Sequence, residues 1–352
     1  MSATVVMRVA GVFAALAMLL SGFGFSQSVP VAEAAVTAPC EFDIQGDQMR
    51  LQNDCLTTET IMVPDGMTLN GRNHLITAKD PEGGTFNGAV IKNEGSVANV
   101  INTEIRAVGL QNVCKSGDDR LRGILFEGAS GTIDGNTIKR LNKNNGDSGC
   151  QEGNGIEVRN APFDGTHPGT TGVMISNNLV KNYQKGGIIV NGDVDAYVLN
   201  NVVKSSASQD SLAANAIQIG FGAQGTVKDN SIGGNQWCGP SNYVATAVLV
   251  YQNGGKTSVR GNDTTGNADV GMYMSGDETM VVRNNNVIDD NSIADCNVNG
   301  YDIGIGAYGD HITVLNNTVG GFDTPIDGDP DGSGNKILRA FAPASKEPSP
   351  FF

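Results

Sequence analysis

A short segment of the form apolar-x-x-Asn-x-apolar recurs seven times in this chain and constrains its fold more than any other feature. The copies lie at intervals of roughly 23 to 42 residues, and insertions account for the longer intervals. One copy departs from the pattern, because it ends on Thr264 where the others end on an apolar residue. The seven copies begin at Ile133, Ile175, Val198, Val227, Val259, Val282 and Val314. Repeats of this length that pack on their neighbours predict a solenoid, with one repeat in each coil.

A second apolar segment precedes each copy. It has only three or four residues, is led by Gly or Ala, and alternates apolar with variable positions, which indicates a very short strand. These segments begin at Gly123, Gly155, Gly187, Ala216, Ala247, Gly271 and Gly304. Equivalent strands of successive coils would stack in parallel about 4.8 Å apart, with apolar side chains in the bore. We expect the repeated Asn residues to form one stacked file, because Asn bonds neighbouring backbone and tolerates the left-handed conformation.

Composition agrees with a coiled all-β chain. The sequence holds 47 Gly and 36 Asn, both poor helix formers, which excludes a helical bundle. Hydrophobic residues make up 39% of the chain, enough to fill a core and to exclude wholesale disorder. We therefore predict an all-β fold, a single-stranded parallel β-helix of roughly 9–11 coils.

The repeat resembles that of the right-handed parallel β-helix superfamily, the fold of pectate lyases and many polysaccharide-acting proteins. The segment from Ile61 to Ile76 is also similar to the opening coil of that superfamily. The resemblance covers residues 56–335 and implies right-handed coiling and a polysaccharide partner. It implies no particular activity, because function depends on sites rather than on the fold.

The chain divides into four parts. Residues 1–34 read as a signal peptide, with an apolar run and a small-x-small pattern that predicts cleavage near Ala34. An uncleaved membrane anchor is the alternative. We expect an N-terminal cap over 35–60, the β-helix over 61–335 and a loose tail over 336–352. The mature protein would be secreted, periplasmic or at the cell surface, without membrane contact after cleavage.

Charge and cysteines narrow the partners and the compartment. The formal net charge of −14 argues against nucleic acid as a partner. Six Cys in an exported chain favour three disulfides over a zinc site, although sequence does not determine their connectivity. We expect the pairs Cys40–Cys55, Cys114–Cys150 and Cys238–Cys296, because each would stabilise a nearby segment that departs from the regular coil.

Outward positions of the Gly-led strands carry the first candidate binding face. They place Glu157, Arg159, Gln218, Tyr251, Tyr273 and Tyr308 along one side of the solenoid. Tyr rings among amides and charges suit stacking on sugar rings and bonding to hydroxyls. The alternative is that these residues simply cover one face.

A row of cations is the second candidate. Lys228, Arg260 and Arg283 occupy the same outward position in consecutive Asn-containing strands. Like charges directly opposite each other destabilise a sheet, so the row favours a polyanion such as a uronic-acid polymer. A solvated basic stripe, relieved by Asp229 and Asp263, is the alternative.

The candidate catalytic group centres on His167, in an insertion that follows Glu157 and Arg159. Asp164 would orient His167 for proton abstraction next to a uronate carboxylate, which Arg159 would neutralise. The segment resembles the Asp-Pro-His signature of alginate epimerases, except that two residues replace the Pro. An ordinary polar loop is the competing interpretation.

These residues leave three classes of function open. The first is polysaccharide binding with modification by a lyase or C5-epimerase, and whether the chain is an enzyme stays undecided. The second is a non-catalytic adhesin or envelope scaffold, favoured by the lack of Gly-His-Gly and Arg-x-Pro-x-x-Arg elements. The third follows from a resemblance to periplasmic β-helix accessory proteins of copper-enzyme maturation. Its local support is Met272, Met274 and Met280.

No cofactor is expected. Calcium is the one metal with candidate ligands, and a charged turn is the alternative for them. These ligands would be Asp323, Asp327, Asp329 and Asp331. The sugar and the oligomeric state stay open.

Overall fold

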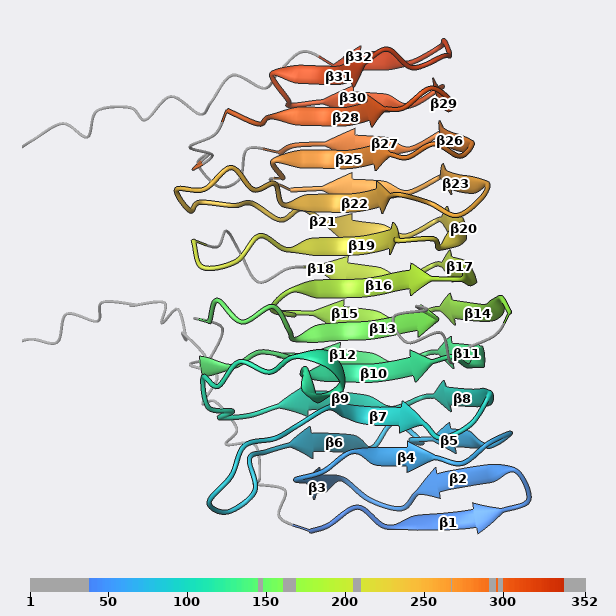
Figure 1. Ribbon diagram of the computed structural model, residues 1–352, viewed down its shortest axis with the longest axis vertical. Coiled ribbons are helices and arrows are strands. Elements are labelled where there is room, and N and C mark those ends of the chain that lie inside the picture. Colours follow the sequence, from blue (N-terminus) through green and yellow to red (C-terminus); the bar gives the residue numbers. More distant parts are fainter. Residues whose placement is uncertain are drawn as a thin grey trace, which may run out of the picture. The chain divides into compact units, whose positions relative to one another are not determined.

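The chain folds into a solenoid of parallel strands, with three short strands in each coil (Figure 1). The computed structural model describes residues 38–338, apart from 145–147, 161–168, 205–209, 267, 291–295 and 297–299. Strands of successive coils form sheets of 10, 11 and 11 strands, in agreement with the predicted number of coils. The expected right-handed parallel β-helix is confirmed.

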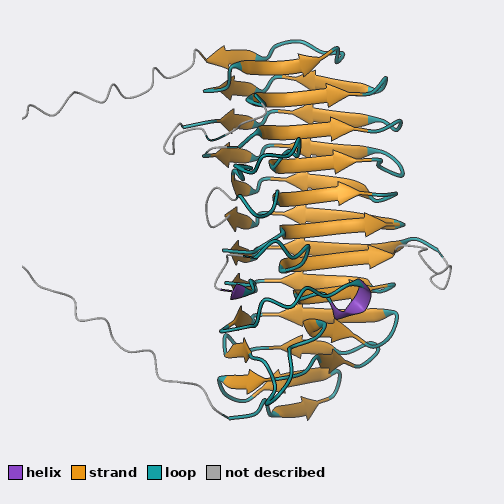
Figure 2. Ribbon diagram, turned by 60° about the vertical axis from the view of Figure 1, so that its left-hand side comes forward, coloured by secondary structure: helices purple, strands orange, loops and turns teal. Residues whose placement is uncertain are grey.

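We name the three sheets in the order in which a coil visits them, and their strands lie stacked in Figure 2. The first sheet contains β4 (Ile61–Val63), β7 (Ala89–Asn93), β10 (Arg122–Glu127), β13 (Asn154–Asn160), β16 (Gly186–Gly192), β19 (Asn215–Gly220), β22 (Thr246–Tyr251), β25 (Val270–Ser275), β28 (Ile303–Tyr308) and β31 (Thr324–Gly328). The second contains β1 (Phe42–Gln45), β2 (Gln48–Leu51), β5 (Thr68–Asn70), β8 (Val97–Ile101), β11 (Ser130–Asp134), β14 (Thr171–Ser176), β17 (Val194–Leu199), β20 (Gln224–Lys228), β23 (Thr257–Arg260), β26 (Met280–Arg283) and β29 (Ile312–Leu315). The third contains β3 (Cys55–Thr57), β6 (Leu75–Ala78), β9 (Glu104–Ala107), β12 (Thr137–Lys139), β15 (Leu179–Lys181), β18 (Val202–Lys204), β21 (Ser231–Gly233), β24 (Asp263–Thr265), β27 (Asn286–Ile288), β30 (Thr318–Gly320) and β32 (Lys336–Leu338).

The sequence repeat predicts two strands in each coil, and the structure has three. Each apolar-x-x-Asn-x-apolar segment spans a corner, so that its first half lies in the second sheet and its second half in the third. In the copy that begins at Ile133, for example, β11 ends at Asp134 and β12 starts at Thr137. The two apolar positions both point into the bore, which is why they resemble a single strand in the sequence.

The predicted file of Asn residues runs along this corner. In Asn178, Oδ1 accepts hydrogen bonds from the backbone N–H of Asn136 at 2.9 Å and from its Nδ2 at 3.0 Å. The Nδ2 of Asn178 donates to the carbonyl of Ile133 at 2.9 Å. The same contacts recur at Asn201, Asn230, Asn262, Asn285, Asn317 and Asn335. The last member escapes detection in the sequence, because Gly332 stands where the repeat has an apolar residue.

The left-handed conformation is one residue away from where we expected it. It belongs to the residue before each ladder Asn, as at Asn177 with φ 55°, Asn200 with φ 55° and Asn284 with φ 56°. Asn therefore recurs at two adjacent positions for two reasons. The first tolerates φ > 0, and the second bridges the backbones of neighbouring coils.

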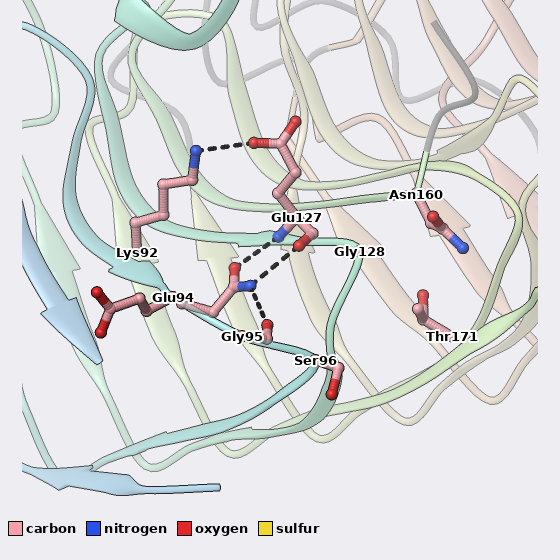
Figure 3. A pocket seen from close by; sticks show the side chains of 9 residues that line it. Lys92, Glu94, Gly95, Ser96, Glu127, Gly128, Asn160 and Thr171 are labelled. Carbon is pink, nitrogen blue, oxygen red and sulfur yellow. Dashed lines mark hydrogen bonds and ion pairs between the residues drawn. The ribbon is translucent and has the colours of Figure 1, made fainter. Parts of the chain in front are cut away.

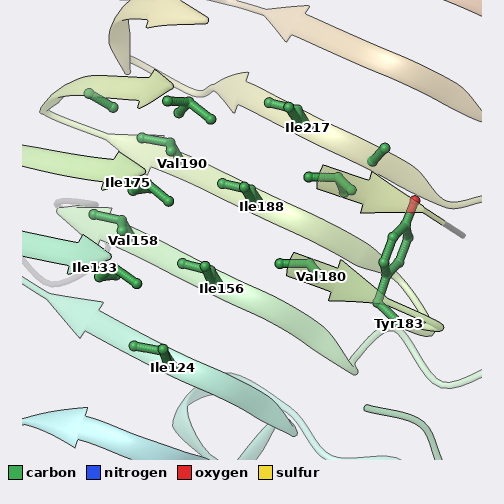
Figure 4. Close-up of a cluster of buried hydrophobic side chains, with 14 of the residues drawn as sticks. Ile124, Ile133, Ile156, Val158, Ile175, Val180, Tyr183, Ile188, Val190 and Ile217 are labelled. Atoms are coloured by element: carbon green, nitrogen blue, oxygen red, sulfur yellow. The ribbon is translucent and has the colours of Figure 1, made fainter. Parts of the chain in front are cut away.

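Apolar side chains from all three sheets fill the bore (Figure 4). Ile124, Ile156, Ile188 and Ile217 occupy one position on four adjacent strands, and each is fully buried. Full burial of such a side chain contributes roughly 1.5–3 kcal/mol. Because each side chain packs on its equivalent in the next coil, the core fixes the strand register and hence the outward rows.

Both ends of the solenoid reach beyond the predicted boundaries. At the N-terminal end, β1 and β2 form an antiparallel hairpin, and β2 and β3 already pair in parallel with β5 and β6. At the C-terminal end, β32 pairs with β30, so the solenoid extends past residue 335 to Leu338. The predicted signal peptide and the remainder of the predicted tail lie outside the described residues.

Three disulfides brace the solenoid, and they join the predicted pairs. The Cα–Cα distances are 4.8 Å for Cys40–Cys55, 5.0 Å for Cys114–Cys150 and 5.1 Å for Cys238–Cys296. The second ties two insertions together. The first of these carries the single-turn 3-10 helix η1 (Gly117–Asp119). No helix within the described ranges is long and apolar enough to cross a membrane.

Candidate functional site

The outward rows of the first sheet stack as the sequence predicts. One row contains Glu157, Gln218 and Tyr273, and the next contains Arg159, Tyr251 and Tyr308. Their side chains differ sharply in how they are engaged. Ion pairs dominate the N-terminal coils, amides the middle, and aromatic rings the C-terminal coils.

Arg159 is held by carboxylates of the protein. Its Nη2 pairs with Glu127 Oε1 at 2.6 Å and with Asp118 of η1. Lys92 on β7 pairs with the same two carboxylates, at 2.8 Å to Glu127 and 3.6 Å to Asp118. Burial alone would lower the pKa of Arg159, but Glu127 and Asp118 outweigh it and raise that pKa. The guanidinium that we expected to neutralise a substrate is therefore already neutralised within the fold.

Glu157 lies in a closed, buried ion pair. Arg122 donates to its carboxylate from Nε at 2.7 Å and from Nη2 at 3.3 Å, and Asn154 Nδ2 donates at 2.7 Å. Burial would raise the pKa of Glu157, but the charge and hydrogen bonds of Arg122 lower that pKa below its usual range. Arg122 also donates to the carbonyls of Gly117, Asp118 and Arg120. The pair thus fastens the insertion that carries η1 onto the first sheet.

A cavity of about 480 Å³ lies beside these ion pairs (Figure 3). Its lining consists of Lys92, Asn93, Glu94, Gly95, Ser96, Glu127, Gly128, Asn160 and Thr171. Asn160 and Thr171 stand on either side of residues 161–168 in the sequence. The predicted base His167 and its partner Asp164 belong to that segment and lie outside the described residues.

The amide of Gln218 is engaged at both ends. Its Nε2 donates to Asn191 Oδ1 at 2.8 Å, and its Oε1 accepts from Asn215 Nδ2 at 3.1 Å. Only 8% of Gln218 is exposed. The residue therefore ties neighbouring coils together.

The predicted tyrosines pack on one another and on Phe221. Ring centroids lie 5.1 Å apart for Tyr273–Tyr308 and 5.5 Å apart for Phe221–Tyr251. The hydroxyl of Tyr308 donates to Asp327 at 2.8 Å, and burial together with this carboxylate raises the pKa of Tyr308. Phe221 is half exposed at φ 53°, an uncommon conformation for a bulky residue.

The basic row predicted on the second sheet is present. Arg260 lies directly opposite Lys228 on one side and Arg283 on the other. Lys228 pairs with Asp229 at 2.9 Å as expected, whereas Asp263 accepts a hydrogen bond from Asn286. The Nε atoms of Arg260 and Arg283 are buried without a hydrogen-bond partner. Within the described ranges, neither guanidinium forms an ion pair.

A second basic row, on the third sheet, was not predicted. Arg106, Lys139, Lys181 and Lys204 occupy equivalent positions on β9, β12, β15 and β18. Arg106 donates to Thr77 at 3.2 Å. The sequence does contain the signal, since each of these lysines lies three residues after a ladder Asn. A search restricted to two strands in each coil overlooks it.

The candidate calcium ligands and the methionines considered for copper do not form a metal site among the described residues. Among the residues that it describes, no three His, Cys, Asp or Glu side chains gather to hold a metal ion, and Asp327 bonds Tyr308 instead. Met272, Met274 and Met280 are buried in the core. Their thioethers are therefore not exposed for copper.

Comparison with known proteins gives one family match. Residues 165–327 match the family described as "Right handed beta helix region". The search of curated proteins gives no match.

Solved structures with a similar fold include two tailspikes and an enzyme. The Dettilon tailspike protein is 15% identical with a TM-score of 0.46, over 83% of this chain and 61% of that one. Tailspike protein 3 of bacteriophage CBA120 is 10% identical with a TM-score of 0.34, over 88% and 56%. DFA-IIIase from Arthrobacter chlorophenolicus A6, in complex with DFA-III, is 13% identical with a TM-score of 0.31, over 82% and 74%.

These solved structures share no more than a fold with this chain. The chain spans about three fifths of the length of the two tailspikes. The family match covers the ladder from Asn178 to Asn317 and the basic row of the second sheet. With three parallel sheets closing every coil, the chain is a right-handed parallel β-helix protein.

Proposed function

We propose that this chain binds an acidic polysaccharide, such as a uronic-acid polymer, along the outer face of its second sheet. The observation that carries the proposal is the stacked pair Arg260 and Arg283, which forms no ion pair within the described part of the chain. Their neighbour Lys228 extends the row by one coil.

The physical argument concerns the energy of like charges. Cations on adjacent strands stand about 4.8 Å apart and repel each other, which destabilises the sheet. A polymer with regularly spaced carboxylates would offset this repulsion, and guanidinium groups bind carboxylates through two parallel hydrogen bonds. The net charge of −14 makes nucleic acid the weaker candidate for the same row.

Binding has stronger support than catalysis. A lyase or C5-epimerase would use His167 as its base with Asp164, Glu157 and Arg159 around it. Glu157 and Arg159 are held by Arg122, Glu127 and Asp118, which suits a structural role. A non-catalytic adhesin or scaffold fits the proposal, and the three disulfides suit an oxidising compartment outside the cytoplasm.

Affinity electrophoresis of the full chain in gels that contain alginate, pectate or neutral dextran tests the proposal. We expect retardation by an acidic polymer that weakens with salt, and none by dextran. The variant Arg260→Gln/Arg283→Gln should bind about tenfold more weakly. The matched control Lys139→Gln/Lys181→Gln removes the same charge from the third sheet and should bind within about twofold of wild type.

Two results would contradict the proposal. One is no retardation by any acidic polymer, and the other is an equal loss in the two double variants, which would reflect net charge alone. Ultraviolet absorbance of unsaturated uronates in the same mixtures tests for a lyase, and NMR of the recovered polymer tests for an epimerase. Either signal would overturn the non-catalytic version.

A further inference from the structure

A groove of about 290 Å³ lies on the outer face of the second sheet, next to the basic row. It crosses β17, β20 and the start of β23. Its lining consists of Asp195, Tyr197, Gln224, Gly225, Thr226, Lys256 and Ser258. This volume is near the lower limit of ligand pockets, which start at roughly 300 Å³. The groove is therefore of a size for one small ring rather than for a folded partner.

Tyr197 gives the groove an exposed aromatic wall. The residue is 46% exposed, and its cross-strand neighbour Met174 is 45% exposed. Tyr197 has no stacking or hydrogen-bonding partner within the described residues, in contrast to Tyr273 and Tyr308 on the first sheet. Nearly half of the surface of Tyr197 is thus accessible to a ligand.

The polar side chains that line the groove are equally free. Within the described ranges, no side-chain hydrogen bond or ion pair engages Asp195, Gln224, Thr226, Lys256 or Ser258. Polar side chains of the first sheet, by contrast, are engaged with one another, as in the ion pair between Lys92 and Glu127. A groove with unengaged donors and acceptors around an exposed ring suits a ligand that carries many hydroxyl groups.

Gly225 is one of the residues that line the groove. It adopts φ 133°, and a Cβ at this position would lie 2.0 Å from the carbonyl oxygen of Ala196. The close approach of β17 and β20 thus requires Gly.

We propose that this groove is a subsite for one sugar ring of the bound polysaccharide, stacked on Tyr197 and bonded through its hydroxyls by the surrounding polar side chains. Thr226 lies directly opposite Tyr197, and Lys228 follows two residues later on the same face. Two residues along a parallel strand span about 6.6 Å and neighbouring strands lie about 4.8 Å apart, so Lys228 is about 8 Å from Tyr197. A ring on Tyr197 therefore brings its carboxylate to the basic row. This inference rests on the proposed function. It adds a subsite that would distinguish an acidic polysaccharide from polyanions without sugar rings.

The test compares sugar and non-sugar polyanions by affinity electrophoresis with full-length variants. Tyr197→Ala should weaken binding of alginate or pectate about five- to tenfold, because the stacking surface is lost. The same variant should leave binding of polyglutamate, which contacts only the basic row, within about twofold. Tyr197→Phe keeps the ring and should retain most of the affinity for uronate polymers. Tyr243→Ala, which removes an exposed tyrosine elsewhere, is the matched control.

The outcomes separate this inference from the proposed function. If Tyr197→Ala binds uronate polymers as wild type does, or loses polyglutamate equally, the subsite is wrong while the basic row stands. If Arg260→Gln/Arg283→Gln changes nothing, the assignment of the basic row is wrong. If no acidic polymer binds at all, both proposals fail. Unchanged urea-unfolding midpoints of each variant confirm that a loss of binding is not a loss of folding.

Discussion

Replacement of Glu157 by Gln should destabilise the fold by about 3–5 kcal/mol, because it leaves Arg122 as a buried cation without its counter-ion. The side chains of Arg122 and Glu157 are only 1% and 8% exposed, so water cannot compensate. Three N–H groups reach the carboxylate within 3.3 Å, from Arg122 Nε, Arg122 Nη2 and Asn154 Nδ2. The amide of Gln can accept some of these hydrogen bonds but cannot balance the charge.

Urea unfolding at pH 7, followed by circular dichroism, measures this loss directly. A pH series adds a second readout, because the pKa of Glu157 is held below its ordinary value of 4.5. A lowered pKa in the folded state means that the carboxylate stabilises the fold fully above about pH 4.5. That stabilisation disappears as the pH falls through the folded pKa, and the stability of Glu157→Gln should depend less on pH in this range.

Two further variants serve as controls for Glu157→Gln. Glu278→Gln, at an exposed turn, should change stability by less than about 0.5 kcal/mol. Arg122→Met/Glu157→Leu removes both charges and should recover most of the loss. If Glu157→Gln unfolds at the same urea concentration as wild type yet no longer binds polysaccharide, the structural role of Glu157 is wrong and the carboxylate belongs to the binding site.

Two other predictions concern buried polar groups. Asn201→Ala should cost about 2–5 kcal/mol, because it orphans the backbone N–H of Asn178 and the carbonyl of Ile175. The rate of hydrogen exchange at the backbone amide of Asn178 measures this effect. If that rate is the same in Asn201→Ala as in the exposed control Asn200→Gly, the prediction is wrong. Lys185 donates to the carbonyl of Ala213, and burial together with Arg120 lowers its pKa to about 8. Its charged form therefore opposes folding, so wild-type stability should rise with pH between about 8 and 10.5. Lys185→Met should be more stable than wild type at pH 7 by about 1–2 kcal/mol, and a thermal midpoint that is unchanged would refute this.

The repeat made much of the scaffold predictable. Each coil places Asn at the same corner and an apolar residue at the same inward position. The position of Asn178 in the repeat therefore predicts its place in the ladder, and that of Ile156 predicts its burial in the core. The basic row Lys228–Arg260–Arg283 follows from the same register, because residues at one repeat position must stack. The third strand of each coil was missed, since its single inward residue looks like the end of the preceding strand. The lysines at 139, 181 and 204 were missed with it.

The ion pairs that the candidate site residues form were not predictable from the repeat. Arg122 and Glu157, like Lys92 and Glu127, come from different coils, and Asp118 comes from an insertion that lies outside the repeat. The repeat does not predict which cation will form an ion pair with which carboxylate when the two residues lie far apart in the sequence. The pairing depends on how the insertion lies on the first sheet, and it engages two of the predicted catalytic residues, Glu157 and Arg159, in ion pairs within the fold.

By itself, the sequence determined the coil, the ladder of Asn residues and the outward rows. All of these features recur with the period of the coil. Only the tertiary structure decided which outward side chains are free. On the first sheet, ion pairs between side chains satisfy the charges. On the second sheet, no side-chain hydrogen bond or ion pair among the described residues engages Arg260, Arg283 or Tyr197. Whether a polar group is available to a ligand depends on what surrounds it in space, and that is a property of packing rather than of the repeat.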